Sequence, residues 1–571
     1  MKAFGRVLIA MLALSVIACG GGGGSPMATS PPAPPPPAPP PPPPPPPPLP
    51  TVDPEYRASS QTPFAVNCDN VPVNGTVFVN AEVEPYLAVD PRDANHMIGA
   101  WQQDRWSNGS ARGVIVGVSL DGGVNWSRRA VAFSRCGGGN VLNGGDYTRV
   151  TDPWVTFSPN GVAHAMALST TGASFAAGSV NAMLASRSLD GGNTWSSPIT
   201  LIQDGAGFFN DKNTITADPG DANLVYAVWD RLVAGNAGGP TYFSRSTDGG
   251  ASWEAARSIF DPGATSQTIG NVIAVTPEGL LVNLYTQLTT VNGQQSASLG
   301  VIRSLDKGVT WSTPTRIADA LAIGARDPDT GVLVRDGSLL AQIAVSPRTG
   351  DLFVVWQDSR FSAGAVDAIA LSVSVDDGMT WSAPRRVNNT AVNVHAFTPS
   401  VHVRADGMVG VTYYDMRANT TDTTVLQTEY WLARSSDAGA TWTETRIANV
   451  FDLDTAPNAG GYFLGDYQAL ASRGNVFVPF YVRTTSGDPN NATDVFAAPA
   501  VSAAGPLPMA NAIAPVIAPQ ALSAPVRFTS QWQQRIDANI DRSLAAGRSS
   551  QQPRRAKQAP ARRTSVSTQP R

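Results

Sequence analysis

Short apolar runs broken by turn-forming residues recur through most of the chain. The runs are rich in Val, Ile, Thr and aromatic residues, and Gly, Asn, Asp and Pro separate them, a pattern that predicts short β-strands. Between residues 339 and 389, the sequences LLAQIAVSP, LFVVWQD, AIALSVSVDDGMTW and APRRVNN predict four such strands in succession. Four antiparallel strands recurring at about 60 residues are typical of a propeller blade. We therefore expect an all-β fold.

An octapeptide of the form S-x-D-x-G-x-x-W accompanies the predicted third strands. Ser and Asp side chains can bond nearby backbone amides, Gly can adopt a positive φ, and Trp can bury its ring, so the octapeptide predicts a pinned hairpin. The pattern resembles the Asp box of the sialidase superfamily, over roughly residues 60 to 502. Its copies begin at Ser119, Ser188, Ser246, Ser304, Ser374 and Ser435.

The number of repeats favours seven blades, although the family resemblance implies six. First and second strands can be paired seven times, from EPYLAVDP with HMIGAWQQ to DYQALASRG with VFVPFYV. The last unit has no octapeptide, and we expect its fourth strand to come from GTVFVN, residues 75–80. Cys68 and Cys136 flank the first unit, so a disulfide at the ring closure is one expectation and two buried thiols the other.

Both ends of the chain have biased composition. Residues 1–18 have the layout of a secretory signal, and Val16-Ile17-Ala18-Cys19 resembles a lipobox, with Cys19 lipidated. An ordinary cleaved signal is the alternative. The composition of residues 19–58 predicts a Gly/Pro-rich stalk, or alternatively a ligand for a proline-binding partner. After the propeller at 59–502, residues 503–571 predict a disordered tail with a short helix around 529–545 and a basic end. We expect an exported, membrane-anchored lipoprotein.

Composition and charge narrow the expected partners. The formal net charge of −4 argues against a surface built for nucleic acid. Four His, three Cys and no Cys-x-x-Cys pair give little material for a metal cluster, so we expect no metal and no cofactor, with calcium not readable from the residues. The seven basic residues from Arg548 onward predict a solvated tail, or one attracted to anionic lipid or envelope polymer.

The alternation of antiparallel strands predicts which end of the sheets carries the functional residues. Turns between first and second strands and the hairpins pinned by the octapeptides lie at one end, and loops between second and third strands lie at the other. At that other end, four second strands finish in related motifs, WQQDR, VWDR, WQDSR and YYDMR. Their arginines predict an anion clamp, or else ion pairs between neighbouring blades. These residues are Arg105, Arg231, Arg360 and Arg417.

Loops between blades place a second, less regular set of residues at the same end. Because these residues differ from blade to blade, they suit an asymmetric site. They are Glu84, Tyr147, Arg149, Asp152, Asp211, Lys212, His395, Asp466 and Tyr467.

The family resemblance implies roles for several of these residues. LGDYQAL places Tyr467 in a setting similar to that of the sialidase nucleophile. Glu84 or Asp466 would handle the proton, Asp104 is a substitute for the usual acid/base aspartate, and Glu429 is a candidate to support Tyr467. Arg105 is similar in place to a family arginine, and Arg149 and Asp152 join the expected binding residues. Where the family has Arg-Ile-Pro, this chain has Val83-Glu84-Pro85.

Two functions from different classes follow. The first is a sialidase-like exo-glycoside hydrolase that acts on terminal, acidic sugars of extracellular glycans. The second is a non-catalytic propeller that binds glycan or an envelope protein, because a fold does not fix a function. In both we expect a monomer that meets the membrane only through its N-terminal lipid.

Overall fold

The computed structural model describes residues 54–71, 74–235, 237–485, 492–499 and 529–548. The predicted signal, Cys19, most of the stalk and the basic end of the chain lie outside these residues. Among the described residues, no helix has the length and apolar character needed to span a membrane.

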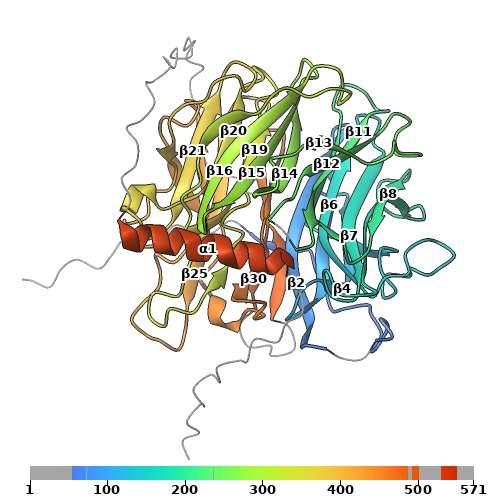
Figure 1. Ribbon diagram of the computed structural model, residues 1–571, viewed down its shortest axis with the longest axis horizontal. Helices are drawn as coiled ribbons and strands as arrows, with labels where there is room; N and C mark the ends of the chain where they lie inside the picture. The colour runs from blue at the N-terminus through green and yellow to red at the C-terminus, as the bar shows by residue number, and fades with distance from the viewer. Residues whose placement is uncertain (1–53, 72–73, 236, 486–491, 500–528, 549–571) are drawn as a thin grey trace, which may run out of the picture. The chain divides into compact units, whose positions relative to one another are not determined.

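Antiparallel strands form successive groups along the described chain, and most groups hold four strands (Figure 1). The first two groups are β2 (Val77–Asp90), β3 (Asp93–Trp106), β4 (Ala111–Ser119) and β5 (Ser127–Val131), then β6 (Arg149–Phe157), β7 (Ala163–Thr171), β8 (Val180–Ser188) and β9 (Ile199–Asp204). The next two are β10 (Phe208–Ala217), β11 (Val225–Val233), β12 (Thr241–Ser246) and β13 (Arg257–Phe260), then β14 (Ser266–Val275), β15 (Leu281–Val291), β16 (Gln294–Ser304) and β17 (Thr315–Asp319).

The later groups follow the same plan. They are β19 (Gln342–Val345), β20 (Leu352–Asp358), β21 (Ala368–Ser374) and β22 (Arg385–Arg386), then β23 (Ala396–Val403), β24 (Val409–Asp415), β25 (Gln427–Ser435) and β26 (Thr443–Arg446), then β29 (Ala469–Arg473), β30 (Val476–Thr484) and β31 (Thr493–Ala497). Short elements between them are β18 (Val334–Arg335), η1 (Arg360–Ser362), β27 (Phe451–Asp452), η2 (Leu453–Thr455) and β28 (Tyr462–Phe463).

The first strands of the groups lie next to one another. Contacts run in the order β2, β6, β10, β14, β19, β23 and β29, and β29 contacts β2 again. Apolar side chains from facing sheets fill the space between groups and form the cores of the fold. This arrangement of four-stranded antiparallel sheets is consistent with the expected propeller.

The closing strand differs from the expected one. Val77–Asn80 does not supply the fourth strand of the last group, because it belongs to β2 and pairs with β3, Val77 opposite Trp106. β1 (Tyr56–Arg57) pairs antiparallel with β31 instead, Tyr56 opposite Ala497. The prediction from GTVFVN is therefore confirmed only in part. β2 lies next to β31 and pairs with it in parallel at Ala81, opposite Thr493, but Val77 and Phe78 pair with β3, and the shorter upstream segment β1 makes the antiparallel pairing.

The octapeptides form the hairpins that their residues predict. In the first copy, Ser119 Oγ accepts from Gly123 N at 2.9 Å, and Asp121 Oδ1 accepts from Asn125 N at 2.9 Å. Gly123 has φ +96°, and the buried Trp126 donates from Nε1 to the Gly123 carbonyl at 2.9 Å. The physical interpretation of the octapeptide as a pinned turn is confirmed.

These hairpins lie at the end of the sheets where the first strand of each group finishes. Gly122 and Gly249 donate from their backbone nitrogens to the carbonyls of Asn95 and Asn223, next to the turns between first and second strands, each at 2.9 Å. His96, on β3, contacts the carbonyl of Gly191 in the next hairpin at 2.8 Å. The starts of the first strands, and the side chains they carry, are therefore at the opposite end.

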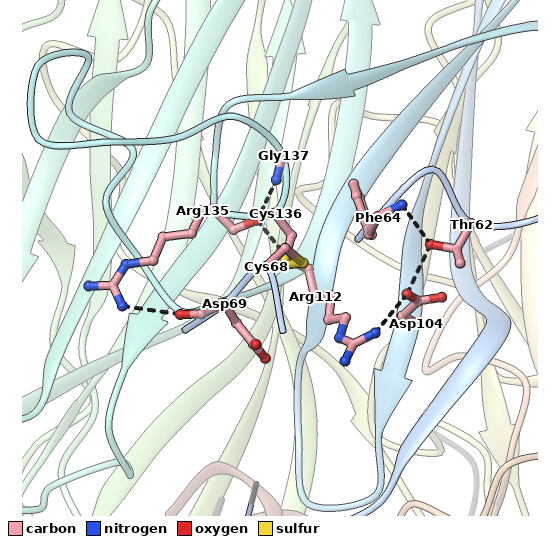
Figure 2. The surroundings of a disulfide bond; sticks show 10 residues. Thr62, Phe64, Cys68, Asp69, Asp104, Arg112, Arg135, Cys136 and Gly137 are labelled. Carbon is pink, nitrogen blue, oxygen red and sulfur yellow. Dashed lines mark hydrogen bonds and ion pairs between the residues drawn. A yellow bond between two sulfur atoms is a disulfide. The ribbon is translucent and has the colours of Figure 1, made fainter. Parts of the chain in front are cut away.

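A disulfide joins the segment before β2 to the end of the first group (Figure 2). Cys68 and Cys136 are bonded, with their Cα atoms 4.9 Å apart. Arg135 donates to the Asp69 carbonyl at 3.1 Å, and Asp104 accepts from Thr62 Oγ1 at 2.9 Å and lies 3.6 Å from Arg112. The segment that leads into β2 is thus fastened covalently and by polar contacts.

Removing this disulfide should lower the free energy of unfolding by about 3 kcal/mol, because a closed loop of this size strongly limits the unfolded chain. The two cysteines are 68 positions apart. Urea denaturation of the Cys68→Ser, Cys136→Ser double variant measures the loss. A reductant should lower the stability of the natural chain similarly and leave that of the double variant unchanged. A natural chain insensitive to reductant would contradict the prediction.

The C-terminal helix α1 (Ser530–Arg548) lies close to the predicted residues 529–545. The sequence did not predict that it packs on the sheets. Trp532, Ile536 and Ile540 are buried in the core of the fourth and fifth groups. This part of residues 503–571 is therefore a docked element rather than a tail.

Candidate functional site

Residues in the left-handed region mark the starts of three neighbouring first strands. Glu84 on β2, Asp152 on β6 and Lys212 on β10 have φ of 54°, 53° and 50°. The pairing register shifts at each position, between Val83 and Tyr86 in β2 for example. Such bulges re-aim side chains, and a non-glycine residue in this region costs about 1–3 kcal/mol. The same bulge with a positive φ recurs at Gly270 on β14 and at Thr398 on β23, with φ of 68° and 50°, so it is a repeated feature of the first strands. At the three neighbouring positions it carries Glu84, Asp152 and Lys212.

Asp466 and Lys212 are the centre of a network of opposite charges. Asp466 accepts from Arg335 through both carboxylate oxygens, at 3.0 and 2.7 Å. Lys212 Nζ lies 2.8 Å from Asp466 Oδ2 and 3.4 Å from Asp152 Oδ1. Arg335 and Lys212 hold the pKa of Asp466 well below its usual range, despite burial. Asp466 is therefore ionised at neutral pH.

Glu84 is held in the opposite protonation state. Burial, with the nearby Asp152 carboxylate as the second cause, raises the pKa of Glu84 to about 8. Gln102 donates to Glu84 Oε2, while no partner within the described chain contacts the buried Oε1. Glu84 is thus a carboxylic acid that still carries its proton at neutral pH.

Asp152 accepts hydrogen bonds from Lys212 N at 3.2 Å and Lys212 Nζ at 3.4 Å. Burial opposes ionisation of Asp152, but the charge of Lys212 helps to lower its pKa below the usual value. The pKa of Asp211 is raised to about 7, chiefly by burial and also by Asp152. The pKa of Asp152 is thus lowered while those of Glu84 and Asp211 are raised, which is the separation of pKa values that acid–base chemistry uses.

Two arginines lie over the Phe463 ring. The guanidinium carbon of Arg105 is 4.6 Å and that of Arg335 4.4 Å from the ring centroid. Arg105 donates to Gln102 Oε1 at 2.7 Å, and its Nε has no partner among the described residues. Burial and the charge of Arg335 lower the pKa of Arg105 to about 10. The parallel pairing of β18 with β28 places Arg335 opposite Phe463.

The cluster opens to solvent through its cations. The side chains of Arg335 and Lys212 are 23% and 13% exposed, whereas that of Asp466 is 7% exposed and Glu84 is fully buried. A ligand that approaches this end therefore meets the two cations first, and an anion is favoured.

Tyr467 lies beside the cluster, and its hydroxyl is hydrogen-bonded to the backbone. The hydroxyl donates to the Pro153 carbonyl at 3.0 Å. The Tyr467 ring contacts the Trp154 ring, with centroids 5.2 Å apart. Burial and the neighbouring carboxylates raise the pKa of Tyr467 well above its usual range. The residue is packed as part of the wall, and its role as a nucleophile stays a prediction.

Three of the four expected clamp arginines are held elsewhere in ion pairs. Arg231 binds both oxygens of Asp204 at 2.8 and 2.7 Å. Arg360 binds both oxygens of Asp358, each at 2.8 Å, and Arg417 binds Asp415 at 2.6 Å and Glu444 at 2.9 Å. Of these three, Arg231 alone pairs with an acid of the neighbouring group, whereas Arg360 and Arg417 pair with acids of their own groups. Of the four arginines, Arg105 is the one that faces the cluster.

Other predicted residues also lie outside the cluster. Asp104 fastens the segment before β2, accepting from Asn80 N and Thr62 Oγ1, each at 2.9 Å. Arg149 lies over the Trp106 ring at 4.2 Å. Glu429 pairs with Arg446 at 3.0 Å, Tyr147 donates to Gln203 at 2.9 Å, and His395 accepts from Asp367 N at 3.1 Å.

The structure brings together Glu84, Asp152, Asp466 and Arg105 from the predicted set, and adds residues that the sequence did not single out. Arg335 precedes the first strand of its group, as Asp466 does, so its position along the chain was the available signal. Gln102 lies on β3, in the WQQDR motif. Within the described chain, no group of three or more His, Cys, Asp and Glu is arranged to hold a metal ion.

Comparison with known proteins gives similarity in fold. No protein-family model matches the chain. A Hadza microbial sialidase is 16% identical with a TM-score of 0.42, over 72% of this chain and 74% of the other. A mutant NanB sialidase from Streptococcus pneumoniae is 11% identical (TM-score 0.39), and an α-L-arabinanase from Penicillium chrysogenum is 12% identical (TM-score 0.40). Both cover 78% of this chain and 98% of their own. The solved structures that this chain resembles include sialidases and an arabinanase.

Proposed function

We propose that the chain is an exported glycoside hydrolase that acts on terminal acidic sugars. The observation that carries the proposal is a buried cluster in which Arg335 binds both oxygens of Asp466, while Glu84 Oε1 has no hydrogen-bond partner among the described residues. The pKa of Asp466 is accordingly lowered and that of Glu84 raised. In this proposal the strand groups form a seven-bladed ring, and a lipid on Cys19 holds the monomer at a membrane.

The two partly exposed cations, Arg335 and Lys212, would bind the acidic group of the sugar. A carboxylate that takes a place on Arg335 competes with Asp466 for the same bidentate donors. Asp466 would then lose part of the pairing that keeps its pKa low, and would become a better base. Binding of an acidic sugar and activation of Asp466 are coupled in this way.

The reaction requires one acid and one base. Asp466 would take a proton from the attacking water, and Glu84 would give its proton to the oxygen of the leaving group. The anomeric carbon gains a bond to the water oxygen as its bond to the leaving oxygen breaks. Glu84 is fully buried, so the leaving oxygen would have to enter the cluster to receive its proton.

A non-catalytic glycan-binding propeller is the second candidate. It is favoured by the burial of Glu84 and Asp152, neither of which has appreciable exposed surface. In that case the cluster would stabilise the centre of the fold, and Arg335 and Lys212 alone would contact the ligand.

A panel of aryl glycosides tests the proposal with the purified full chain. The panel includes conjugates of N-acetylneuraminic acid, glucuronic acid and neutral sugars. We expect turnover of an acidic conjugate, and Tyr467→Phe should retain it because the Tyr467 hydroxyl donates to the Pro153 carbonyl. Loss of turnover in Tyr467→Phe would favour a tyrosine nucleophile instead. Binding of acidic sugars without turnover would establish the second candidate and overturn the first.

A further inference from the structure

Helix α1 is fastened to the sheets by one apolar side. Trp532, Ile536 and Ile540 follow one another at intervals of four residues, which places them on the same face of a helix. All three are buried in the core that β14–β17 and β19–β21 share. The helix lies at the end of the sheets that carries the cluster, because it contacts loops between second and third strands and between groups.

The surface beneath α1 is shaped to receive it. Trp532 donates from Nε1 to Ser359 Oγ at 2.8 Å, and Arg535 donates to the Gly364 carbonyl at 2.6 Å. Gly364 has φ +83°, and a β-carbon there would lie 2.3 Å from Trp532 Cγ. A side chain at 364 would therefore displace the helix, so this glycine permits the close approach.

The second half of α1 makes polar contacts nearer the cluster. The buried Asn539 donates from Nδ2 to the Ala322 carbonyl at 3.0 Å and to Ser338 Oγ at 2.9 Å. Arg542 donates to the Ile323 carbonyl at 3.1 Å. The helix also contacts β10, the strand that carries Lys212.

Ser338 closes the turn that follows Arg335. Its backbone nitrogen donates to Asp336 Oδ1 at 3.1 Å. Gly337 has φ +58°, and a β-carbon there would lie 1.9 Å from the Asp466 carbonyl oxygen. The turn 335–338 is therefore packed directly against Asp466, whose carboxylate Arg335 binds through both oxygens.

We propose that Asn539 is a positioning residue of the cluster. Its amide bridges the Ala322 carbonyl and the Ser338 hydroxyl and so fixes the turn from which Arg335 reaches Asp466. The C-terminal helix is then part of the site, although it follows the last strand by more than thirty positions. The consequence for catalysis rests on the proposed function, whereas the consequence for the turn does not.

Hydrogen–deuterium exchange of the full chain tests the positioning directly. In Asn539→Ala, we expect peptides that cover residues 333–340 to exchange about tenfold faster. The side chain loses the bonds that its Nδ2 donates to Ala322 and Ser338, and those that its Oδ1 accepts from Ser338 Oγ and Arg542. Gln534→Ala, an exposed amide on the same helix, is the matched control and should leave this exchange unchanged. Asn539→Asp keeps an oxygen near Ser338 but lacks the donor to the Ala322 carbonyl. Its exchange rate at residues 333–340 should therefore lie between those of the natural chain and Asn539→Ala.

Kinetics give the second readout. If the chain hydrolyses an acidic glycoside, Asn539→Ala should raise KM about tenfold and change kcat less than twofold, because Arg335 binds the acidic group. Exchange that stays at the natural rate in Asn539→Ala would overturn the positioning role, even with an active enzyme. Faster exchange at 333–340 in a chain that turns over no glycoside would support the positioning role while the proposed function fails.

Discussion

Replacing Glu84 by Gln should lower kcat for an acidic glycoside by about 10³-fold, the usual size of a general-acid contribution. The amide has nearly the same shape but cannot give a proton to the leaving oxygen. Initial rates at saturating substrate measure the effect. Because Glu84 is buried and the amide introduces no charge, the variant should fold as the natural chain does.

Glu82 provides a matched control on the same strand. It is also fully buried, its pKa is raised by burial, and it accepts from Gln103 Nε2 at 2.5 Å. Glu82→Gln therefore makes the same chemical change two positions away, next to Asp494 rather than Asp152. We expect its kcat to stay within about threefold of the natural value. Equal losses in both variants would show that kcat reports the fold and not an acid at Glu84.

The pH dependence of kcat adds an independent check on the same residue. The pKa of Glu84 is raised to about 8, and the acid must be protonated to act. Activity should therefore persist at neutral pH and fall as the pH rises above about 8. Residual activity of Glu84→Gln should lack this alkaline decline. A decline centred near the ordinary glutamate pKa would contradict the role given to Glu84.

Sequence reasoning succeeded where a feature is local along the chain. The Ser-to-Trp hairpins were predictable because every hydrogen bond in them joins residues a few positions apart. Glu84, Asp152 and Asp466 were predictable as a group, because each stands near the start of a first strand and strand parity puts those starts at one end.

Sequence reasoning did not predict the features that depend on pairing between segments far apart in the chain. β18 and β28 have two residues each and lie more than a hundred positions apart, so no periodicity reveals them. Their pairing is nevertheless what places Arg335 beside Phe463 and Asp466. β1 pairs with the last group through only two residues. A segment this short gives a weaker strand signal in the sequence than residues 75–80, which pair mainly with β3. The Asp–Arg motifs were recognised, but only the structure separates Arg105 from the three arginines already paired.

Replacing Asp466 by Asn should lower the free energy of unfolding by about 3 kcal/mol, measured by urea denaturation at neutral pH. The substitution removes the carboxylate that Arg335 and Lys212 share, which leaves Arg335 without its carboxylate partner and Lys212 with Asp152 alone. Breaking a buried pair on one side is costly because the remaining charge keeps its desolvation penalty. Asp406→Asn is the control, since Asp406 also binds an arginine, Arg404, through both oxygens, but its side chain is 39% exposed. That variant should lose about 1 kcal/mol or less.

The ion pairs of Asp466 also predict how the difference in unfolding free energy between the natural chain and Asp466→Asn changes with pH and with a second substitution. The pKa of Asp466 is lowered in the folded chain, so its stabilisation is present above the unfolded pKa and is lost as the pH falls through the folded value. The natural chain and Asp466→Asn should therefore converge in acid. Lys212→Met should cost less in the Asp466→Asn background than in the natural chain, because the ion pair between Lys212 and Asp466 is already lost there. Strictly additive losses would show that the two charges do not interact and would remove the electrostatic basis of the cluster.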